Sequence, residues 1–182
     1  MKNVRSIWAI TAACLIAGTF ATTQSRAAEN PDSEQVSKLL SEVRSDALLL
    51  RDDAQLMESY TRSDISRETQ GRTVASVKGH VNTMGKKLTE LVSMKDEASP
   101  WQVAAIERIQ PFLRELADNT TRAIKYINDG PTNYKTGEYK DYLEANADVA
   151  NELFSLISDF VNYGNSKNRM QRLGIKLEVS EN

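Results

Sequence analysis

The chain has 182 residues, of which 40% are hydrophobic and 26% are charged, so its composition excludes a disordered or collagen-like chain and suits one folded domain. The 25 Asp and Glu residues outnumber the 23 Lys and Arg residues, and the net charge of −2 leaves no cationic surplus to bind a phosphate backbone. We therefore expect no nucleic-acid partner.

Residues 1–28 have the order of a secretory signal peptide. Lys2 and Arg5 precede an uncharged, mostly apolar run from residue 7 to residue 21, and small residues near Ala27 and Ala28 offer a cleavage site. The run is shorter than the roughly 20 residues that a membrane-spanning helix needs. We therefore expect residues 1–28 to be removed and residues 29–182 to form one periplasmic or secreted domain without a membrane anchor.

Cys14 offers the alternative to cleavage, since a lipid on this residue would hold the protein at a membrane. Thr11 stands where a lipobox has Leu, and we leave this alternative open. Cleavage would remove three cations and no acid, which brings the net charge to −5. It would also remove the only cysteine, so the exported domain would have neither a disulfide nor a thiol.

The first two predicted helices are marked by apolar residues that recur at alternating steps of three and four, the spacing of one helical stripe. The first helix is expected to begin with Asn30 or Asp32 as its cap. The second is expected from about residues 63–66 to residue 94, and its Gly71, Gly79 and Gly85 indicate close packing or tolerated surface positions. The two stripes are Val36, Leu40, Val43, Ala47, Leu50, Ala54 and Met57, and Val74, Val77, Val81, Met84, Leu88 and Leu91.

The run from Ser99 to Gln102 (SPWQ) predicts the start of a third helix, because Ser caps, Pro suits the first helical position and Gln reaches back to the cap. The run NDGP at 128–131 predicts its end. Pro111 lies inside this helix without an N–H, so we expect a kink there. A fourth helix is expected from about residue 139 to about residue 173. The stripes are Ile106, Ile109, Leu113, Leu116, Thr120, Ala123 and Ile127, and Tyr139, Tyr142, Asn146, Val149, Leu153, Leu156, Ile157, Phe160 and Gly164.

These four helices and the lack of any strand-like alternation predict an all-α fold, an antiparallel up-down-up-down four-helix bundle with a kinked third helix. The same spacing also fits a long helical hairpin that dimerises, so the oligomeric state stays open. The segments Leu113–Thr121 (LRELADNTT) and Leu156–Asn165 (LISDFVNYGN) resemble those of uncharacterised exported bacterial helix-bundle proteins. That resemblance implies an exported helical protein and supplies no activity or functional residues.

His80 is the only histidine, which excludes most chemistry that helical bundles house. A di-iron centre needs two Glu-x-x-His motifs, covalent haem needs Cys-x-x-Cys-His, and tetrahedral zinc needs several His or Cys ligands. A Ser-His-Asp triad would depend entirely on His80. Haem held by His80 with Met57 or Met84 is an alternative, but a Met on an apolar stripe is usually core. We expect no metal, no cofactor and no catalytic residues, and therefore no enzyme.

The predicted topology brings the end of the first helix, the start of the second, the end of the third and the start of the fourth together. We call this the polar end, because the stripe positions there are polar, whereas those at the opposite end are apolar. Arg67 has a planar guanidinium that suits a carboxylate or phosphate. The alternative is a hydrated bundle end in which Glu68 or Asp118 neutralises Arg67. The candidate ligand-binding residues are Arg67, Gln70, Thr120, Tyr139, Tyr142 and Asn146.

Taken together, the sequence predicts an exported, non-enzymatic helical bundle that acts as a binding or protein-interaction module. The alternative is a carrier or sensor of a small anionic or polar ligand at the polar end. Apolar residues off the stripes, such as Leu39, Leu49, Trp101 and Phe154, would favour a protein partner if they formed an exposed patch.

Overall fold

The computed structural model describes residues 30–129 and 137–177. The signal sequence, Cys14 and the predicted turn after residue 129 lie outside these ranges. The elements are α1 (Glu34–Ser59), the 3-10 turn η1 (Tyr60–Arg62), α2 (Arg67–Ser93), the 3-10 turn η2 (Lys95–Glu97), α3 (Pro100–Asp129) and α4 (Glu138–Leu177). Within the described ranges there is no strand, and the predicted all-α class is confirmed.

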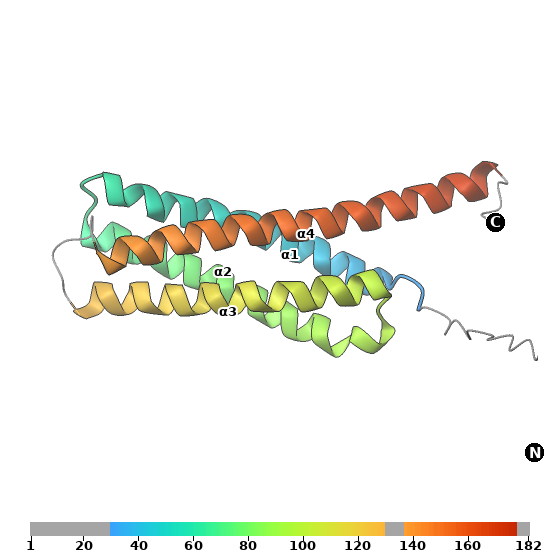
Figure 1. Cartoon of the computed structure of the whole chain (residues 1–182), viewed down its shortest axis with the longest axis horizontal. Helices are drawn as coiled ribbons and strands as arrows, with labels where there is room; N and C mark the ends of the chain where they lie inside the picture. The colour runs from blue at the N-terminus through green and yellow to red at the C-terminus, as the bar shows by residue number, and fades with distance from the viewer. Residues whose placement is uncertain (1–29, 130–136, 178–182) are drawn as a thin grey trace, which may run out of the picture.

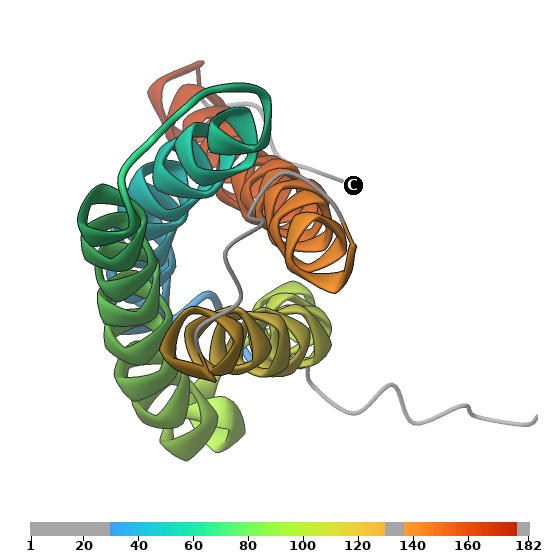
Figure 2. The same cartoon turned by 90° about the vertical axis from the view of Figure 1, so that its left-hand side faces the viewer.

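The four helices pack side by side in a closed ring. Each helix contacts the next one along the chain, and α4 also contacts α1. Figure 2, which looks along the bundle, shows this ring with α1 between α2 and α4. In Figure 1 the carboxyl end of α1 and the amino end of α2 lie at one end of the molecule, together with the carboxyl end of α3 and the amino end of α4. The prediction of four mutually packed helices is therefore confirmed.

The start of α1 differs from the prediction. Ser33 is the cap, and its Oγ accepts a hydrogen bond from the N–H of Val36 at 3.4 Å. Neither predicted residue stands at the N-cap position, and the side chains of both bind elsewhere. Asn30 donates from Nδ2 to the carbonyl of Asp96 at 2.8 Å, and Asp32 accepts from the indole N–H of Trp101 at 2.7 Å. Contacts between distant segments thus decide the cap.

The other helix ends agree more closely with the sequence. Ser66 caps α2, with its Oγ 3.2 Å from the N–H of Thr69, and Gln102 reaches back to the N–H of Ser99 at 3.0 Å. The fourth helix is longer than expected, ending at Leu177 and not near residue 173. Its last turns contain no Pro and several good helix formers, which allow the helix to continue past Gly174.

The predicted stripes of α1, α2 and α3 make up most of the core. On α4 the stripe was partly wrong, because Leu143, Ala147, Ala150 and Val161 are buried where the half-buried Tyr142, Val149, Leu156 and Phe160 were expected. Of the four apolar residues off the stripes, Leu39 is buried, Trp101 and Phe154 are half-buried, and Leu49 is exposed. The core therefore includes residues beside the predicted stripes on α1 and α3, namely Leu39 and part of Trp101. The buried apolar residues with no exposed surface are Val36, Leu40, Val43, Ala47, Leu50, Ala54, Val77, Met84, Leu91, Ala105, Ile106, Ile109, Leu116, Ala123, Leu143, Ala150, Leu153 and Ile157.

The glycines divide into two kinds. A Cβ added at Gly71, Gly79 or Gly85 would meet nothing within 4 Å, so these are tolerated open positions and not sites of close packing. Gly164 is different, because a Cβ there would lie 2.7 Å from Cη2 of Trp101. The missing side chain at Gly164 is what allows α4 to approach the indole ring this closely.

We predict that Gly164→Ala lowers the free energy of unfolding. Overpacking against the indole costs about 1–3 kcal/mol, which outweighs the gain of up to about 1 kcal/mol from helix propensity. The matched control is Gly79→Ala on α2, which should raise the free energy of unfolding by about 0.5–1 kcal/mol because its Cβ enters open space. Urea unfolding followed by circular dichroism measures both. Equal stabilisation by the two substitutions would contradict the close approach.

Candidate functional site

The structure divides the six predicted site residues at the polar end into a buried group and an outer pair. Tyr142 is half-buried and Arg67 is exposed. The buried residues come from three different helices, so side-chain packing and not one local segment brings their polar groups inside. These residues are Gln70 on α2, Thr120 on α3, and Tyr139 and Asn146 on α4.

Two amide groups at the polar end have atoms with no hydrogen-bond partner within the described ranges. Asn146 is 0% exposed; its Oδ1 accepts from Thr120 Oγ1 at 3.5 Å, but its Nδ2 donates to nothing. Gln70 is 2% exposed; its Nε2 donates to the carbonyl of Ile65 at 3.1 Å, while its Oε1 accepts nothing. Each such atom costs about 1–3 kcal/mol, so a water or a polar ligand group would be stabilising there.

The two tyrosines of the predicted site pack within the bundle. The ring of Tyr139 stacks on Tyr126 of α3, with centroids 5.2 Å apart. The Tyr142 hydroxyl donates to Glu138 at 3.4 Å, and its ring lies 5.9 Å from the guanidinium of Arg122. Both rings therefore help to join α4 to α3, a structural role that helical spacing alone does not indicate.

Arg67 binds the end of a helix. Its Nη2 donates to the carbonyls of Ile127 and Asn128, in the last turn of α3. Those carbonyls have no partner within the helix and form the negative end of its dipole, so a cation is favourable there. Glu68, one of the expected neutralising acids, instead pairs with Arg72 at 3.6 Å. The guanidinium thus caps the carboxyl end of α3. It forms no hydrogen bond with the buried amides of Gln70 and Asn146.

The opposite end also contains a polar cluster, which its apolar stripe residues do not reveal. Gln102 is 0% exposed, and both of its terminal atoms are fully used. Oε1 accepts from the N–H groups of Ser33 and Ser99, both at 3.0 Å. Nε2 donates to the carbonyl of Ser33 at 2.8 Å and to Oγ of Ser37 at 2.9 Å. This amide therefore joins the start of α1 to the start of α3.

Asp32 completes this cluster. Its Oδ1 accepts from Trp101 Nε1 at 2.7 Å and from Lys167 Nζ at 2.9 Å, so it contacts both α3 and α4. Burial raises the pKa of Asp32, but hydrogen bonds from Lys167, Ser99 and Trp101 outweigh burial and hold the pKa below its usual value of 3.8. Its stabilising contribution is therefore present above pH 3.8 and is lost as the pH falls through the lowered pKa.

We predict that Gln102→Leu lowers the free energy of unfolding by at least about 2 kcal/mol, because leucine leaves the backbone groups of Ser33 and Ser99 buried without partners. Gln110→Leu is the matched control on the same helix; Gln110 is half-buried with no side-chain hydrogen bond to another described residue, and its loss should cost less than about 0.5 kcal/mol. Chemical denaturation compares the two. Similar small effects would show that the Gln102 bonds do not hold this end together.

His80 belongs to a polar cluster that lacks the geometry of a triad. Its Nε2 lies 3.1 Å from Asp53 Oδ2, and Ser76 Oγ donates to the same oxygen. A triad needs the imidazole between the hydroxyl and the carboxylate, whereas here the carboxylate lies between them. The cluster instead joins α2 to α1. Over residues 30–129 and 137–177, no group of three or more His, Cys, Asp or Glu side chains is arranged to hold a metal ion.

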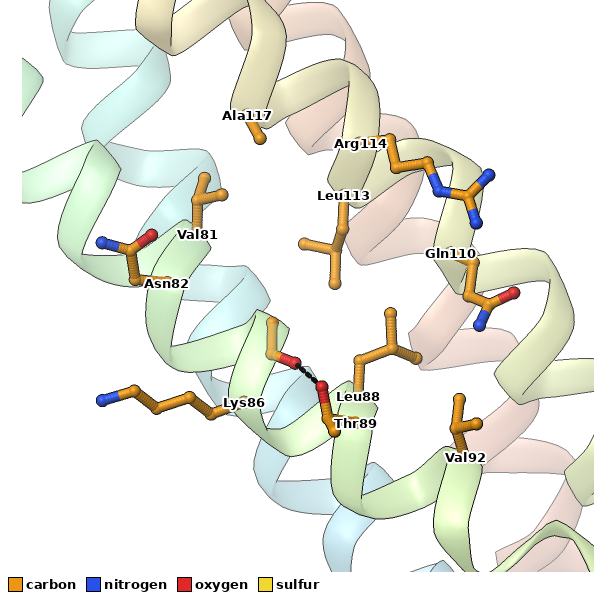
Figure 3. Close-up of a pocket in the computed structure, with 11 residues that line it drawn as sticks. Val81, Asn82, Lys86, Leu88, Thr89, Val92, Gln110, Leu113, Arg114 and Ala117 are labelled. Atoms are coloured by element: carbon orange, nitrogen blue, oxygen red, sulfur yellow. Dashed lines mark hydrogen bonds between the residues drawn. The ribbon is translucent and has the colours of Figure 1, made fainter.

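An open groove of about 730 Å³ lies between the carboxyl-terminal half of α2 and the middle of α3. Figure 3 shows the side chains of Val81, Leu88 and Leu113 pointing into it, while Lys86 and Arg114 point outward from opposite rims. The floor is therefore apolar and the rims are cationic. The lining residues are Val81, Asn82, Gly85, Lys86, Leu88, Thr89, Val92, Gln110, Leu113, Arg114 and Ala117.

Sequence reasoning did not identify this groove. The stripes place Leu88 and Leu113 in the core, and Leu113 is buried there while Leu88 packs against it. A stripe does not show, however, whether the space outside such side chains is filled. Two signals were present: Val92 is an exposed apolar residue beyond the α2 stripe, and Gly85 supplies no side chain on this side of α2. Because a Cβ at Gly85 would meet nothing within 4 Å, the groove stays open at this point.

Comparisons with protein-family models, curated proteins and solved structures find no match to this chain. None of the helices in the described part of the chain is long and apolar enough to cross a membrane. Function must therefore be inferred from the geometry of the groove and of the two bundle ends.

Proposed function

We propose that this chain is an exported, non-enzymatic helical bundle that acts as a protein-interaction module, and that its partner docks in the groove between α2 and α3. The order of charged, apolar and small residues in 1–28 and the resemblance to exported helical proteins support export. The observation that carries the interaction role is the open groove with its apolar floor. Apolar surface left uncovered on a folded domain commonly marks a binding site.

The arrangement that we propose for the exported domain is an antiparallel up-down-up-down bundle with a kink in α3. Ion pairs between α1 and α2 support the antiparallel arrangement. As the residue number of the partner on α1 increases, that of its partner on α2 decreases. Asp46 pairs with Lys87, and Asp53 with His80. The kink is supported by Pro111, which lies inside α3 and has no N–H to donate.

The charges of the groove indicate the chemistry of its partner. Lys86 and Arg114 are the only charged lining residues, and within the described ranges neither forms an ion pair. An apolar floor between two cations fits an amphipathic helix whose apolar stripe is flanked by acidic side chains. A cationic helix would be repelled by the same rims.

We predict that Gly85→Leu blocks the groove without harming the fold. The new side chain enters open space, and replacing a helical glycine favours folding. The probe is 1-anilinonaphthalene-8-sulfonate, an apolar anion that matches the floor and the rims. Its fluorescence should rise with the wild-type chain and with Gly79→Leu, an exposed position on the same helix outside the groove, but not with Gly85→Leu.

A second variant separates loss of binding from loss of folding. Lys86→Glu with Arg114→Glu changes only exposed side chains and should weaken probe binding about tenfold by charge repulsion. Circular dichroism checks that every variant is folded. Equal probe binding by the wild type, Gly85→Leu and the charge-reversed variant would rule out the groove as the site.

The second candidate function is a carrier or sensor of a small anionic or polar ligand at the polar end. The observation that favours it is the pair of buried amide atoms without partners, Gln70 Oε1 and Asn146 Nδ2. A ligand with one donor and one acceptor would satisfy such atoms.

For this candidate we predict that small carboxylates, phosphates or amides raise the Tm of the wild-type chain but not that of Asn146→Leu. The substitution removes the unpaired donor but also the acceptor of the buried Thr120 hydroxyl, so each ligand shift is measured against the Tm of the ligand-free variant itself. Differential scanning fluorimetry measures the shifts, with Asn151→Leu as the exposed control on α4. If no compound in the panel shifts the wild-type Tm, the polar end is only a structural network.

A further inference from the structure

A second pocket lies between α2 and α3, nearer the polar end than the groove. It has a volume of about 210 Å³, and Val74, Ile124 and Ile127 supply apolar lining. Gly71 lines it from α2, and Lys78 is its only charged lining residue. No residue lines both pockets, so the spacing of residues along the two helices decides whether the pockets belong to one surface.

The two pockets lie in line along both helices. On α2, six lining residues follow alternating steps of four and three and therefore share one side of the helix, namely Gly71, Ala75, Lys78, Asn82, Gly85 and Thr89. On α3, steps of four, three, seven and four also keep to one side, along Gln110, Arg114, Ala117, Ile124 and Asn128. Only about one helical turn separates Lys78 in the second pocket from Asn82 in the groove. We call the two pockets together the extended groove.

Two glycines form hollows in the extended groove. A Cβ added at Gly71 or Gly85 would meet nothing within 4 Å. These glycines are 14 residues apart, which is about 21 Å along α2, and the lining positions between them carry side chains. A helix that lies along the groove has the same rise per residue. Two bulky side chains of such a helix would therefore fit the two hollows if they too were 14 residues apart.

The charge of the lining limits what can lie there. Each charged residue that lines either pocket is an exposed cation, and none of the three forms an ion pair within the described ranges; they are Lys78, Lys86 and Arg114. The nearby acids of the same helices line neither pocket; they are Glu90, Glu115, Asp118 and Asp129. Acidic side chains beside the apolar stripe of a bound helix would thus find cations that no other group of the described chain has paired.

We propose that the partner is an acidic amphipathic helix that fills the whole extended groove, with two bulky apolar side chains seated at Gly71 and Gly85. This rests on the proposed function, and it adds the length and spacing of the partner. A helix that reaches both hollows needs at least about 15 residues, or roughly four turns. A shorter helix would occupy the groove around Gly85 alone.

The experiment uses two labelled acidic peptides of about 21 residues and identical composition, built from Ala, Glu and two leucines. In one the leucines are 14 residues apart; in the other they are 11 apart, on the same side but about 4.5 Å closer. Fluorescence anisotropy measures binding. The wild-type chain should bind the first peptide at least about tenfold more tightly, because only this peptide places a leucine in each hollow.

Three glycine variants test the two hollows separately. Gly71→Leu and Gly85→Leu should each weaken binding of the first peptide at least about tenfold, because the new side chain fills a hollow. Gly79→Leu is the matched control, since Gly79 is exposed on the same helix and lines neither pocket, and it should leave binding unchanged. Circular dichroism checks that each variant is folded.

The outcomes separate this proposal from the proposed function. If Gly85→Leu weakens binding but Gly71→Leu does not, or if the two peptides bind equally well, the partner occupies the groove alone. Either result would overturn the proposal and leave the proposed function intact. If neither peptide binds the wild type, the proposal is also overturned, and the test with 1-anilinonaphthalene-8-sulfonate then decides whether the groove binds anything.

Discussion

The hydrogen bonds of Gln102 determine how the rest of the molecule is aligned. They join the start of α1 to the start of α3, and the neighbouring Asp32 adds α4 through Lys167. Apolar stripes alone permit helices to slide along one another by a turn, because dispersion and burial are not directional. A buried amide with all its partners permits one alignment, since any shift would leave backbone groups unpaired in the interior. The packing of Trp101 against Gly164 is consistent with this alignment, because a side chain at position 164 would meet the indole ring.

This alignment also explains why the two ends of the bundle differ. At the Gln102 end, every terminal atom of the buried amide is bonded, and the interactions link three helices. At the polar end, Gln70 and Asn146 each leave one buried atom without a partner in the described part of the chain. The polar end is therefore less stabilised by its own contacts than the Gln102 end. A bound water or ligand would add more stability at the polar end. A site for a small polar molecule is therefore physically better suited to the polar end than to the Gln102 end.

The sequence predicts most of the fold and less of the candidate sites, for a physical reason. Periodicity reports the apolar side of each helix, so the four helices and the buried stripes of three of them could be predicted directly. On α4, apolar residues also recur beside the buried positions, so the stripe was assigned partly to half-buried residues such as Tyr142 and Phe160. It does not report what lies over that side, so the assignment of the buried Leu113 to the core was right while the groove outside it was not predicted. Local motifs suffice where the partner is a few residues away, as for Ser66. They fail where a side chain binds a residue far away in the sequence. Asn30 and Asp32 bind groups of Asp96 and Trp101, and Arg67 binds carbonyls of α3.

The groove and the polar end differ in what they would bind, because charged side chains line one and neutral amides the other. Lys86 and Arg114 on the rims of the groove would favour an acidic helix over a cationic one. At the polar end, Gln70 and Asn146 each leave one buried polar atom without a partner in the described part of the chain, which would suit a small molecule with one donor and one acceptor. A partner of the groove and a ligand of the polar end would therefore be recognised by different chemistry.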